Sequence, residues 1–207
     1  MPHAIARTFH SSEIEDRHFD RLYPTEQRLR SWSHWTPLDV ARRACALLAP
    51  TPGGRILDVG AGVGKVCLVG ALTTDAAWVG VERDLEMVQA AQDAARQLGV
   101  EHRASFIHGG LTSVDWETFD AFYLFNPFGE LLLSSPGDAL TRRETYVANI
   151  EHVQTRLAAA RPGTRVVTYH GFGGDMPWGY ELIRREAAHE DELHLWVRRE
   201  GDGPPRR

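Results

Sequence analysis

Short apolar blocks alternate with helical patterns along most of the chain. The blocks are typical of buried strands and lie at 56–59, 78–81, 105–107, 121–125 and 165–169. Between them lie an apolar segment at 66–72 and helical patterns at 84–98 and 138–160. Strands that alternate with helices form parallel sheets, and continuously apolar strands are buried on both faces. The pattern therefore predicts an α/β fold in three layers, with a doubly wound and mostly parallel sheet.

The C-terminal part of the chain departs from the alternation of strands and helices. Two further strand patterns, at 180–183 and 193–197, have no long helical pattern between them. Strands that are joined by a short connection pair antiparallel, because a parallel pair needs a long crossover. We therefore expect an antiparallel C-terminal hairpin that completes a seven-stranded sheet. Residues 201–207 are expected to form a flexible tail.

The N-terminal part predicts a cap in front of the main domain. Residues 38–48 form an amphipathic helix, with Thr36 expected as its N-cap and Pro37 as its first helical residue. Residues 1–35 are polar and aromatic without clean periodicity, and we expect them to form a short helical cap. The main domain is then expected to span residues 36–200.

Composition narrows the class of protein. The 207 residues are 43% hydrophobic and 25% charged, which suits a globular protein of ordinary composition. No apolar run approaches the ~20 residues of a membrane helix, and the first residues lack the layout of a signal peptide. The two cysteines form neither a disulfide framework nor a zinc spacing, so a cytoplasmic location is expected. The net charge of −5 makes nucleic acid an unlikely partner, because nucleic-acid binding usually leaves a basic footprint.

A glycine-rich turn follows the first predicted strand, and three classes of ligand compete for it. Ligands of open α/β sheets bind at the carboxyl ends of the strands, where glycine lets the backbone approach them. A Walker phosphate loop would need a glycine in place of Val59 and a hydroxyl in place of Val66. A dinucleotide fingerprint would need its third glycine one residue after Gly64, where Lys65 stands. Lys65, the single lysine among the 23 basic residues, is therefore interpreted as the start of the first helix after the turn.

The third class rests on a resemblance. The segment 58–64, Asp-Val-Gly-Ala-Gly-Val-Gly, resembles motif I of the class I S-adenosylmethionine-dependent methyltransferases at every defined position. The resemblance covers about residues 36–199 and implies a Rossmann-like methyltransferase domain with S-adenosylmethionine as its cofactor. It implies that the turn wraps the methionine part of the cofactor and that the leading acid orients the turn and the ammonium group. The implied cofactor residues of the turn are Asp58, Gly60, Ala61, Gly62 and Gly64.

Two further positions extend the predicted cofactor site. Glu82 follows the second strand about 20 residues beyond the glycine turn, where a carboxylate can accept both ribose hydroxyls, and Arg83 is next to it. The family often carries an acid for the adenine amino group after the third strand. Gly110 stands in that place here, so adenine is expected to be held by a backbone group, by a nearby hydroxyl or by packing on Leu111.

The residues that end the fourth strand point to the acceptor. Asn126-Pro127-Phe128 resembles the Asn-Pro-Pro-Tyr/Phe motif of methyltransferases that act on planar nitrogens, with one proline missing. A closer resemblance is to the branch with Asn-Pro-Phe-Gly at this position. The resemblance implies methyl transfer to a nitrogen of a small molecule or a protein. Asn126 and the Pro127 carbonyl would hold the acceptor and contact the cofactor, and Phe128 would stabilise positive charge.

Four residues are further candidates for contact with the substrate. Trp35 and Thr36 belong to the segment expected to cover the cofactor, Glu130 is the carboxylate nearest to the predicted acceptor site, and His170 follows the fifth strand. Histidine can accept a proton near neutral pH. Structural roles remain open for each, since Trp35 can anchor a helix and Glu130 can be a solvated acid. The ten histidines show no spacing of metal ligands, so no metal is expected.

Two alternative functions remain open at this point. The glycine in place of the adenine acid would suit a non-catalytic, cofactor-binding regulatory or partner subunit. A methyltransferase that acts on an oxygen of a small molecule is the other alternative. The intact turn from Asp58 to Gly64 and the carboxylate of Glu82 favour an active enzyme.

Overall fold

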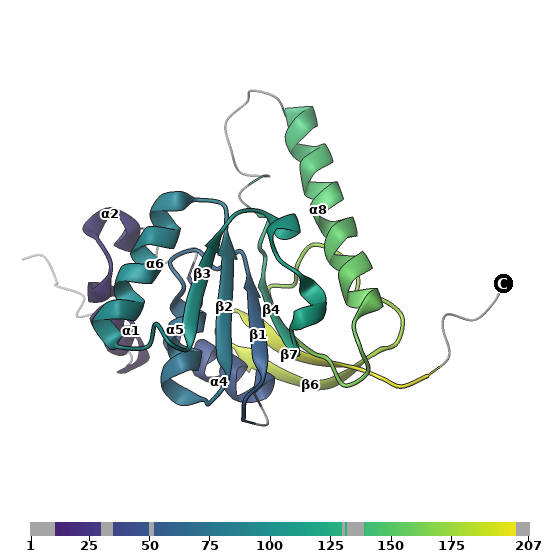
Figure 1. Ribbon diagram of the computed structural model, residues 1–207, viewed down its shortest axis with the longest axis horizontal. Coiled ribbons are helices and arrows are strands. Elements are labelled where there is room, and N and C mark those ends of the chain that lie inside the picture. The colour runs from purple at the N-terminus through teal and green to yellow at the C-terminus, as the bar shows by residue number, and fades with distance from the viewer. Residues whose placement is uncertain (1–10, 30–34, 50–51, 130, 132–138, 202–207) are drawn as a thin grey trace, which may run out of the picture.

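A seven-stranded sheet forms the centre of the molecule in the computed structural model (Figure 1). The structure describes residues 11–29, 35–49, 52–129, 131 and 139–201. The strand order is β3-β2-β1-β4-β5-β7-β6. The first five strands are parallel, and β7 pairs antiparallel with both β5 and β6. This confirms the predicted mostly parallel sheet with a C-terminal hairpin. The strands are β1 (Arg55–Val59), β2 (Ala77–Glu82), β3 (Ala104–His108), β4 (Ala121–Phe125), β5 (Arg165–Tyr169), β6 (Tyr180–Ala188) and β7 (Asp191–Arg198).

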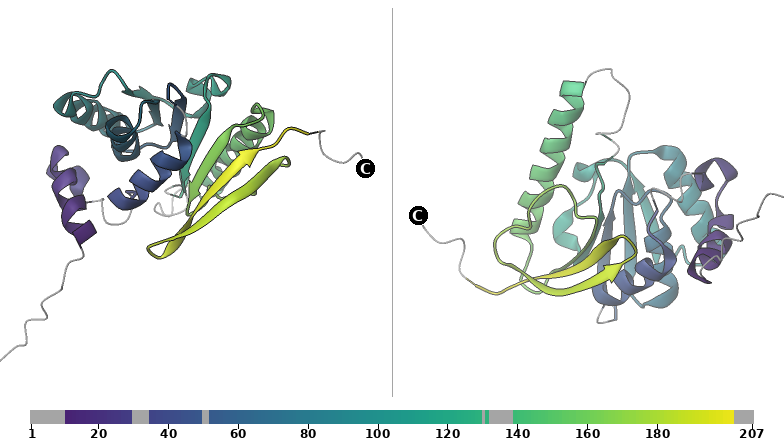
Figure 2. Two further views of the ribbon diagram at one scale, coloured as in Figure 1. Left: turned by 90° about the horizontal axis from the view of Figure 1, so that it is seen from below. Right: turned by 180° about the vertical axis from the view of Figure 1, so that it is seen from behind.

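Helices cover both faces of the sheet, as Figures 1 and 2 show. Side chains alternate along each strand, so Ile56 of β1 faces one buried cluster and Leu57 faces the other. The first cluster includes residues of α4, α5 and α6, and the second includes Val153 and Leu157 of α8. The three predicted layers are therefore confirmed. The helices are α4 (Leu38–Leu48), α5 (Lys65–Thr73), α6 (Leu85–Leu98) and α8 (Ala139–Ala159), with the short 3₁₀ turns η2 (Leu111–Ser113) and η3 (Trp116–Thr118).

The boundaries of α6 follow from its end residues. The Asp84 carboxylate accepts hydrogen bonds from the backbone N–H groups of Glu86 and Met87, at 2.9 and 3.3 Å. These bonds satisfy two donors that the first helical turn leaves free. Gly99 ends the helix with a left-handed φ of 67°, which glycine adopts without strain. The predicted start and end of this helix are both confirmed.

The predicted N-cap of α4 is wrong. Pro37 is the N-cap residue, and it makes no side-chain cap. The Thr36 hydroxyl lies 2.9 Å from the Tyr123 hydroxyl instead, because a buried phenol needs a hydrogen-bond partner. The N–H of Leu38 donates to Asp16 Oδ1 at 3.0 Å, so a carboxylate from the N-terminal segment caps the helix.

Lys65 joins the N-terminal segment to the domain. This segment contains α1 (Ser11–Phe19), η1 (Asp20–Leu22) and α2 (Thr25–Arg28), in agreement with the predicted helical cap. Lys65 begins α5, as predicted, but it is only 4% exposed. Its Nζ pairs with the carboxylates of Asp16 and Asp20, the latter at 2.9 Å. The segment is therefore tied to the sheet next to the glycine turn.

None of the helices within the described residues combines the length and the apolar character that a membrane span requires.

Candidate active site

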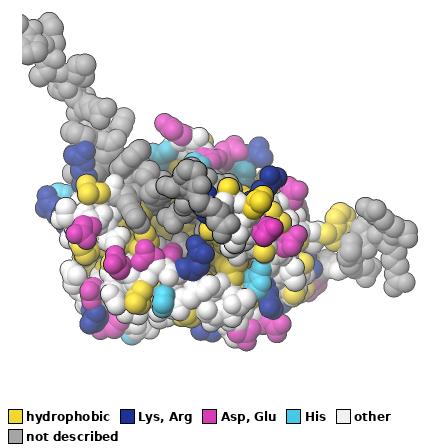
Figure 3. Space-filling model, turned by 90° about the horizontal axis from the view of Figure 1, so that it is seen from above, with side chains coloured by type: hydrophobic (Ala, Val, Ile, Leu, Met, Phe, Trp, Pro, Cys, Tyr) yellow, Lys and Arg dark blue, Asp and Glu magenta, His cyan; other side chains and the backbone are white. Residues whose placement is uncertain are grey.

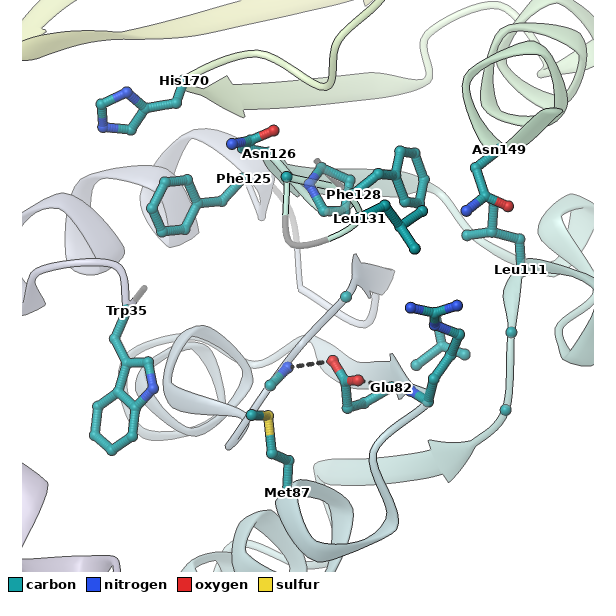
Figure 4. A pocket seen from close by; sticks show the side chains of 18 residues that line it. Trp35, Glu82, Met87, Leu111, Phe125, Asn126, Phe128, Leu131, Asn149 and His170 are labelled. Carbon is teal, nitrogen blue, oxygen red and sulfur yellow. Dashed lines mark hydrogen bonds between the residues drawn. The ribbon is translucent and has the colours of Figure 1, made fainter. Parts of the chain in front are cut away.

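A cavity of about 330 Å³ opens at the carboxyl ends of the parallel strands, where open α/β sheets bind ligands (Figure 4). The loops after β1, β2, β3 and β4 form most of its wall. The N-terminal segment contributes Trp35, the end of β5 contributes His170, and α8 contributes Asn149. The cavity therefore joins parts of the chain that are far apart in sequence.

The glycine turn has the conformation that its sequence suggests. Gly60, Gly62 and Gly64 have φ values of 74°, 55° and 75°, all in the left-handed region that favours glycine. The N–H of Gly60 donates to the carbonyl oxygen of Val81 in β2 at 3.0 Å, which closes the turn against the neighbouring strand. The turn is thus held by backbone bonds and leaves its outer side to the cavity.

The three glycines meet different neighbours. A Cβ atom on Gly60 would lie 3.0 Å from Pro127 Cβ, and one on Gly64 would lie 2.3 Å from the Phe106 ring. A Cβ atom on Gly62 would meet only Met87 Sδ, at 3.9 Å. Gly60 and Gly64 therefore permit close packing, whereas the Gly62 backbone borders open space in the cavity.

Glu82 fixes the turn to the loop that follows β2. Its Oε2 atom accepts a hydrogen bond from the N–H of Gly62 at 3.0 Å, drawn in Figure 4. Its Oε1 atom accepts from the N–H groups of Arg83 and Asp84, at 2.7 and 2.9 Å. A carboxylate offers about four lone-pair sites, so Glu82 retains capacity for a ligand hydroxyl.

The side of the cavity near Glu82 is apolar and has room. Val81, Met87 and Leu111 line it together with the backbone of Gly110. A Cβ atom on Gly110 would meet nothing within 4 Å, so the position of the missing acid is open space. Apolar side chains around an open position suit a flat ring that stacks against them.

Asn126 occupies a tight turn at the end of β4. Its φ is 37°, a left-handed value that asparagine tolerates better than most residues. Its N–H donates to the Gly171 carbonyl oxygen at 2.9 Å, and its own carbonyl oxygen accepts from the N–H of Gly129 at 3.1 Å. The turn is thereby tied to the loop after β5, which places the predicted acceptor-binding residue on a fixed backbone.

Two aromatic residues flank this turn on different sides. Phe128, the predicted aromatic contact, is 6% exposed and belongs to the buried cluster on the α8 side of the sheet, although it also lines the cavity. Phe125, which we did not predict, is partly buried and lines the cavity, with its ring centroid 5.3 Å from that of His170. Phe125 is thus the more exposed of the two residues.

Asp58 lies beneath the glycine turn and does not line the cavity. It is 4% exposed, and Cys67 Sγ lies 3.6 Å from its Oδ2 atom as a hydrogen-bond donor. Burial raises the pKa of Asp58 to about 7; the Cys67 hydrogen bond opposes this rise, and the Glu82 charge adds to it. Its place suggests that it acts on the base of the turn rather than on a ligand directly.

The buried carboxyl of Asp58 makes stability depend on pH. A pKa raised in the folded state means that the folded chain holds a proton that the unfolded chain has released. This contribution is complete below about pH 4, falls by up to about 1.4 kcal/mol per pH unit towards pH 7, and is constant above it. We expect Asp58→Asn to remove this slope from the free energy of unfolding in urea.

The control for this prediction is Asp75→Asn, because the Asp75 side chain is 78% exposed. We expect its profile of unfolding free energy against pH to parallel that of the wild type. Parallel profiles for the wild type and Asp58→Asn between pH 4 and 7 would contradict the assignment.

The cavity brings together most of the residues predicted from the sequence. The predicted residues that line it are Trp35, Gly60, Gly62, Glu82, Arg83, Gly110, Leu111, Asn126, Pro127, Phe128 and His170. Asp58, Ala61, Gly64 and Thr36 lie outside its lining. Glu130 lies outside the described residues, so its predicted contact stays a prediction.

Sequence reasoning missed several residues of the lining. Phe125 carried a usable signal, because it ends the strand that leads directly into Asn126. Met87 and Leu131 look like ordinary apolar positions of a helix and a loop. Asn149 lies within a long helix and has no motif around it. For these three residues only the folded arrangement reveals their place.

Across the described ranges, three or more His, Cys, Asp or Glu side chains nowhere cluster in a way that could hold a metal ion.

Comparison with known proteins gives a family and one curated relative. Residues 56–141 match the protein family described as a methyltransferase domain. The 23S rRNA (uracil(1939)-C(5))-methyltransferase RlmD of Azoarcus sp. (strain BH72) is 36% identical over 120 residues. The match takes in 58% of this chain and 25% of the relative, so the chain spans about a quarter of that relative's length.

Solved structures share the fold at lower identity. An RNA methyltransferase from Salinibacter ruber, solved with S-adenosyl-L-homocysteine, has a TM-score of 0.59 and 23% identity over 83% of this chain and 97% of its own. TrmN from Thermus thermophilus has a TM-score of 0.61 and 19% identity, and the match covers 88% of this chain and 53% of the TrmN chain. MtNAS in complex with S-adenosylmethionine has a TM-score of 0.59 and 14% identity, and the match covers 91% of this chain and 73% of the MtNAS chain. At these identities the likeness establishes the fold, which alone does not fix the substrate.

Proposed function

We propose that the chain is a class I S-adenosylmethionine-dependent methyltransferase and that it transfers the methyl group of this cofactor to a nitrogen atom of its acceptor. The cofactor supplies a methyl group that the positively charged sulfur has already activated. The tasks left to the protein are to hold the cofactor, to orient the acceptor nitrogen and to exclude water. The observation that carries the proposal is the fixed turn of Asn126 and Pro127 opposite the glycine turn.

The residues of the cavity fit this cofactor. The carboxylate of Glu82 would accept a hydrogen bond from a ribose hydroxyl, and Gly60 and Gly62 would bring the backbone close to the amino-acid part. Val81, Met87 and Leu111 would pack against the adenine ring, and the open position at Gly110 offers no acid to its amino group. Among the described lining residues Arg83 is the one arginine, and none is lysine, which suits a ligand without phosphates.

Asn126 and Pro127 would position the acceptor. The Asn126 side-chain oxygen and the Pro127 carbonyl oxygen are hydrogen-bond acceptors, which suits the N–H groups of a planar amino or amide nitrogen. Close placement of a nucleophile can supply much of the acceleration of a displacement reaction. A small molecule or a protein side chain that presents such a nitrogen is the proposed acceptor class.

A base of RNA is a second candidate acceptor, favoured by the name of the curated relative. The net charge of −5 and the mixture of basic and acidic side chains on the face in Figure 3 give it no electrostatic support. Methylation of a ring carbon would need a nucleophile that activates the carbon. Cys45 and Cys67 are fully buried and do not line the cavity, so a nitrogen is the better acceptor atom in an RNA base as well.

Transfer of labelled methyl into a cell extract tests the proposal. The full chain is incubated with methyl-labelled S-adenosylmethionine, and the extract is split into protein, RNA and small-molecule fractions. We expect label on nitrogen in the protein or small-molecule fraction. We expect Asn126→Gly to lower the rate about 10²- to 10³-fold, a typical cost of losing one positioned polar group. Glycine keeps the left-handed backbone, so the affinity for S-adenosylhomocysteine should fall far less than the rate does.

Each other outcome has a distinct meaning. Label in the RNA fraction alone would replace the proposed acceptor class with the second candidate. Label on oxygen or carbon, or full activity of Asn126→Gly, would overturn the role of the Asn126 turn. Cofactor binding without transfer into any fraction would point to the non-catalytic alternative.

A further inference from the structure

His170 forms a pair with a carboxylate that the sequence did not reveal. Its Nδ1 atom pairs with Asp191 Oδ2, and the other oxygen of Asp191 accepts from the N–H of Glu192 at 2.6 Å. Both oxygens of the carboxylate are therefore engaged, which fixes its orientation. A carboxylate on Nδ1 orients the imidazole and leaves Nε2 to exchange a proton.

The C-terminal hairpin brings Asp191 to this position. β7 runs antiparallel to β5, so its first residue lies at the same edge of the sheet as the last residue of β5. Asp191 begins β7, directly after the turn at 189–190 that joins it to β6. The antiparallel pair thus supplies a carboxylate at the edge where the parallel strands form the cavity.

The backbone of His170 is part of the acceptor turn. Its φ is 55°, a left-handed value that is uncommon for residues other than glycine. The next residue, Gly171, accepts the hydrogen bond from the N–H of Asn126 at 2.9 Å. His170 and Asn126 are therefore held in one rigid arrangement.

The surroundings of His170 define one end of the cavity. Trp35, Phe125 and His170 lie on one side in Figure 4, whereas Glu82 and Leu111 lie on the other. Since Glu82 is the proposed ribose contact, the end with Trp35 and Phe125 is left for the acceptor. Two aromatic side chains in such a place suit a flat ring or a flat conjugated group.

We propose that this end is the acceptor subsite, that it takes a flat conjugated group bearing an N–H, and that His170 accepts the proton from that nitrogen. This inference rests on the proposed function. The nitrogen forms its bond to the methyl carbon as the carbon–sulfur bond breaks and its electron pair stays on sulfur. The nitrogen then releases its proton to Nε2 of His170, and the resulting imidazolium is stabilised by Asp191. Asp191 is a positioning residue, because it acts through His170.

Other titratable groups near His170 belong to three elements. Asp191 contacts it from β7, and Tyr169 precedes it in β5 with ring centroids 4.4 Å apart. Tyr169 is in turn surrounded by charged residues, namely Asp191 and Glu190 of the hairpin and Asp39 and Arg43 of α4. Burial and the three carboxylates raise the pKa of Tyr169, so the phenol stays neutral and does not compete as a base near neutral pH.

Rescue by free imidazole tests the role of His170. His170→Gly opens a space in the subsite, and glycine adopts a φ of 55° without strain. We expect the variant to lose about 10²- to 10⁴-fold in the rate of methyl transfer into the accepting extract fraction. Added imidazole should restore at least a tenth of the difference between the wild-type rate and the rate of the variant. The restored rate should rise with pH as the imidazole loses its proton. The affinity for S-adenosylhomocysteine, measured by calorimetry, should stay unchanged.

His189 provides a matched control. It has a φ of 53°, its Nε2 lies 3.0 Å from Asp39 Oδ1, and its side chain is 41% exposed, against 40% for His170. It does not line the cavity. His189→Gly should therefore keep its methyl-transfer rate within about twofold and show no effect of imidazole.

Asp191→Asn tests the positioning role separately. We expect it to lower the rate about tenfold or more, with no rescue by imidazole, because His170 is still present. Methyl transfer by wild type with full activity of His170→Gly would overturn the inference and leave the proposed function intact. An absence of transfer by the wild type into every fraction would instead overturn the proposed function, and this inference with it.

Discussion

Lys65→Met is expected to destabilise the protein by about 3–5 kcal/mol, the usual cost of removing one partner from a buried ion pair. Lys65 is almost fully buried, and its loss leaves the carboxylates of Asp16 and Asp20 without their cation. Methionine matches the length and the apolar stem of lysine, so the change isolates the charge. The free energy of unfolding in urea, compared with the wild type at the same pH, measures the effect.

Arg42→Met is the matched control. Arg42 pairs with Glu15 at 2.7 Å and also joins the N-terminal segment to α4, but both side chains are about half exposed. Exposed pairs contribute at most about 1 kcal/mol. Combining Lys65→Met with Asp16→Asn and Asp20→Asn should recover more than half of the loss, because the uncompensated charges are then gone. A loss for Lys65→Met no larger than that for Arg42→Met would contradict the prediction.

Glu82→Ala is expected to weaken the binding of S-adenosylhomocysteine at least about 30-fold. A hydrogen bond to a charged group contributes about 1.5–3 kcal/mol, and the variant removes the one proposed with the ribose. It also frees the N–H groups of Gly62, Arg83 and Asp84, so the glycine turn loses its tie to the loop after β2. Isothermal titration calorimetry measures the dissociation constant.

Glu86→Ala is the control for this change. Glu86 lies on the same loop and helix start and carries the same charge, but it is exposed and does not line the cavity. We expect its dissociation constant to stay within about threefold of the wild type. If Glu82→Ala bound the ligand as tightly as Glu86→Ala does, the ribose contact would be wrong.

The sequence predicted the sheet and the glycine turn for local physical reasons. Apolar blocks, the Asp84 cap and the glycines at 60, 62 and 64 each specify a short stretch of backbone, and the fold follows from their order. Glu82 was predictable because the end of β2 is adjacent to the end of β1 in such a sheet. The glycine turn, Glu82 and the Asp84 cap lie within about 25 residues of one another.

The features that the sequence did not predict depend on contacts between distant segments. Lys65 pairs with acids from α1 and η1, and the N-terminus of α4 uses Asp16 rather than Thr36. Asp191 meets His170 only because the hairpin folds back beside β5. A local pattern carries no information about such partners. A buried charge needs a partner, but many residues along the chain could be that partner.

Calorimetric titration of the wild-type chain with S-adenosylhomocysteine measures whether the cavity binds the cofactor. We expect saturable binding of one ligand per chain, with a dissociation constant in the micromolar range and a clear loss of affinity in Glu82→Ala. The absence of any binding heat up to high micromolar ligand, with a folded protein, would contradict the claim that this cavity holds the cofactor of a methyltransferase.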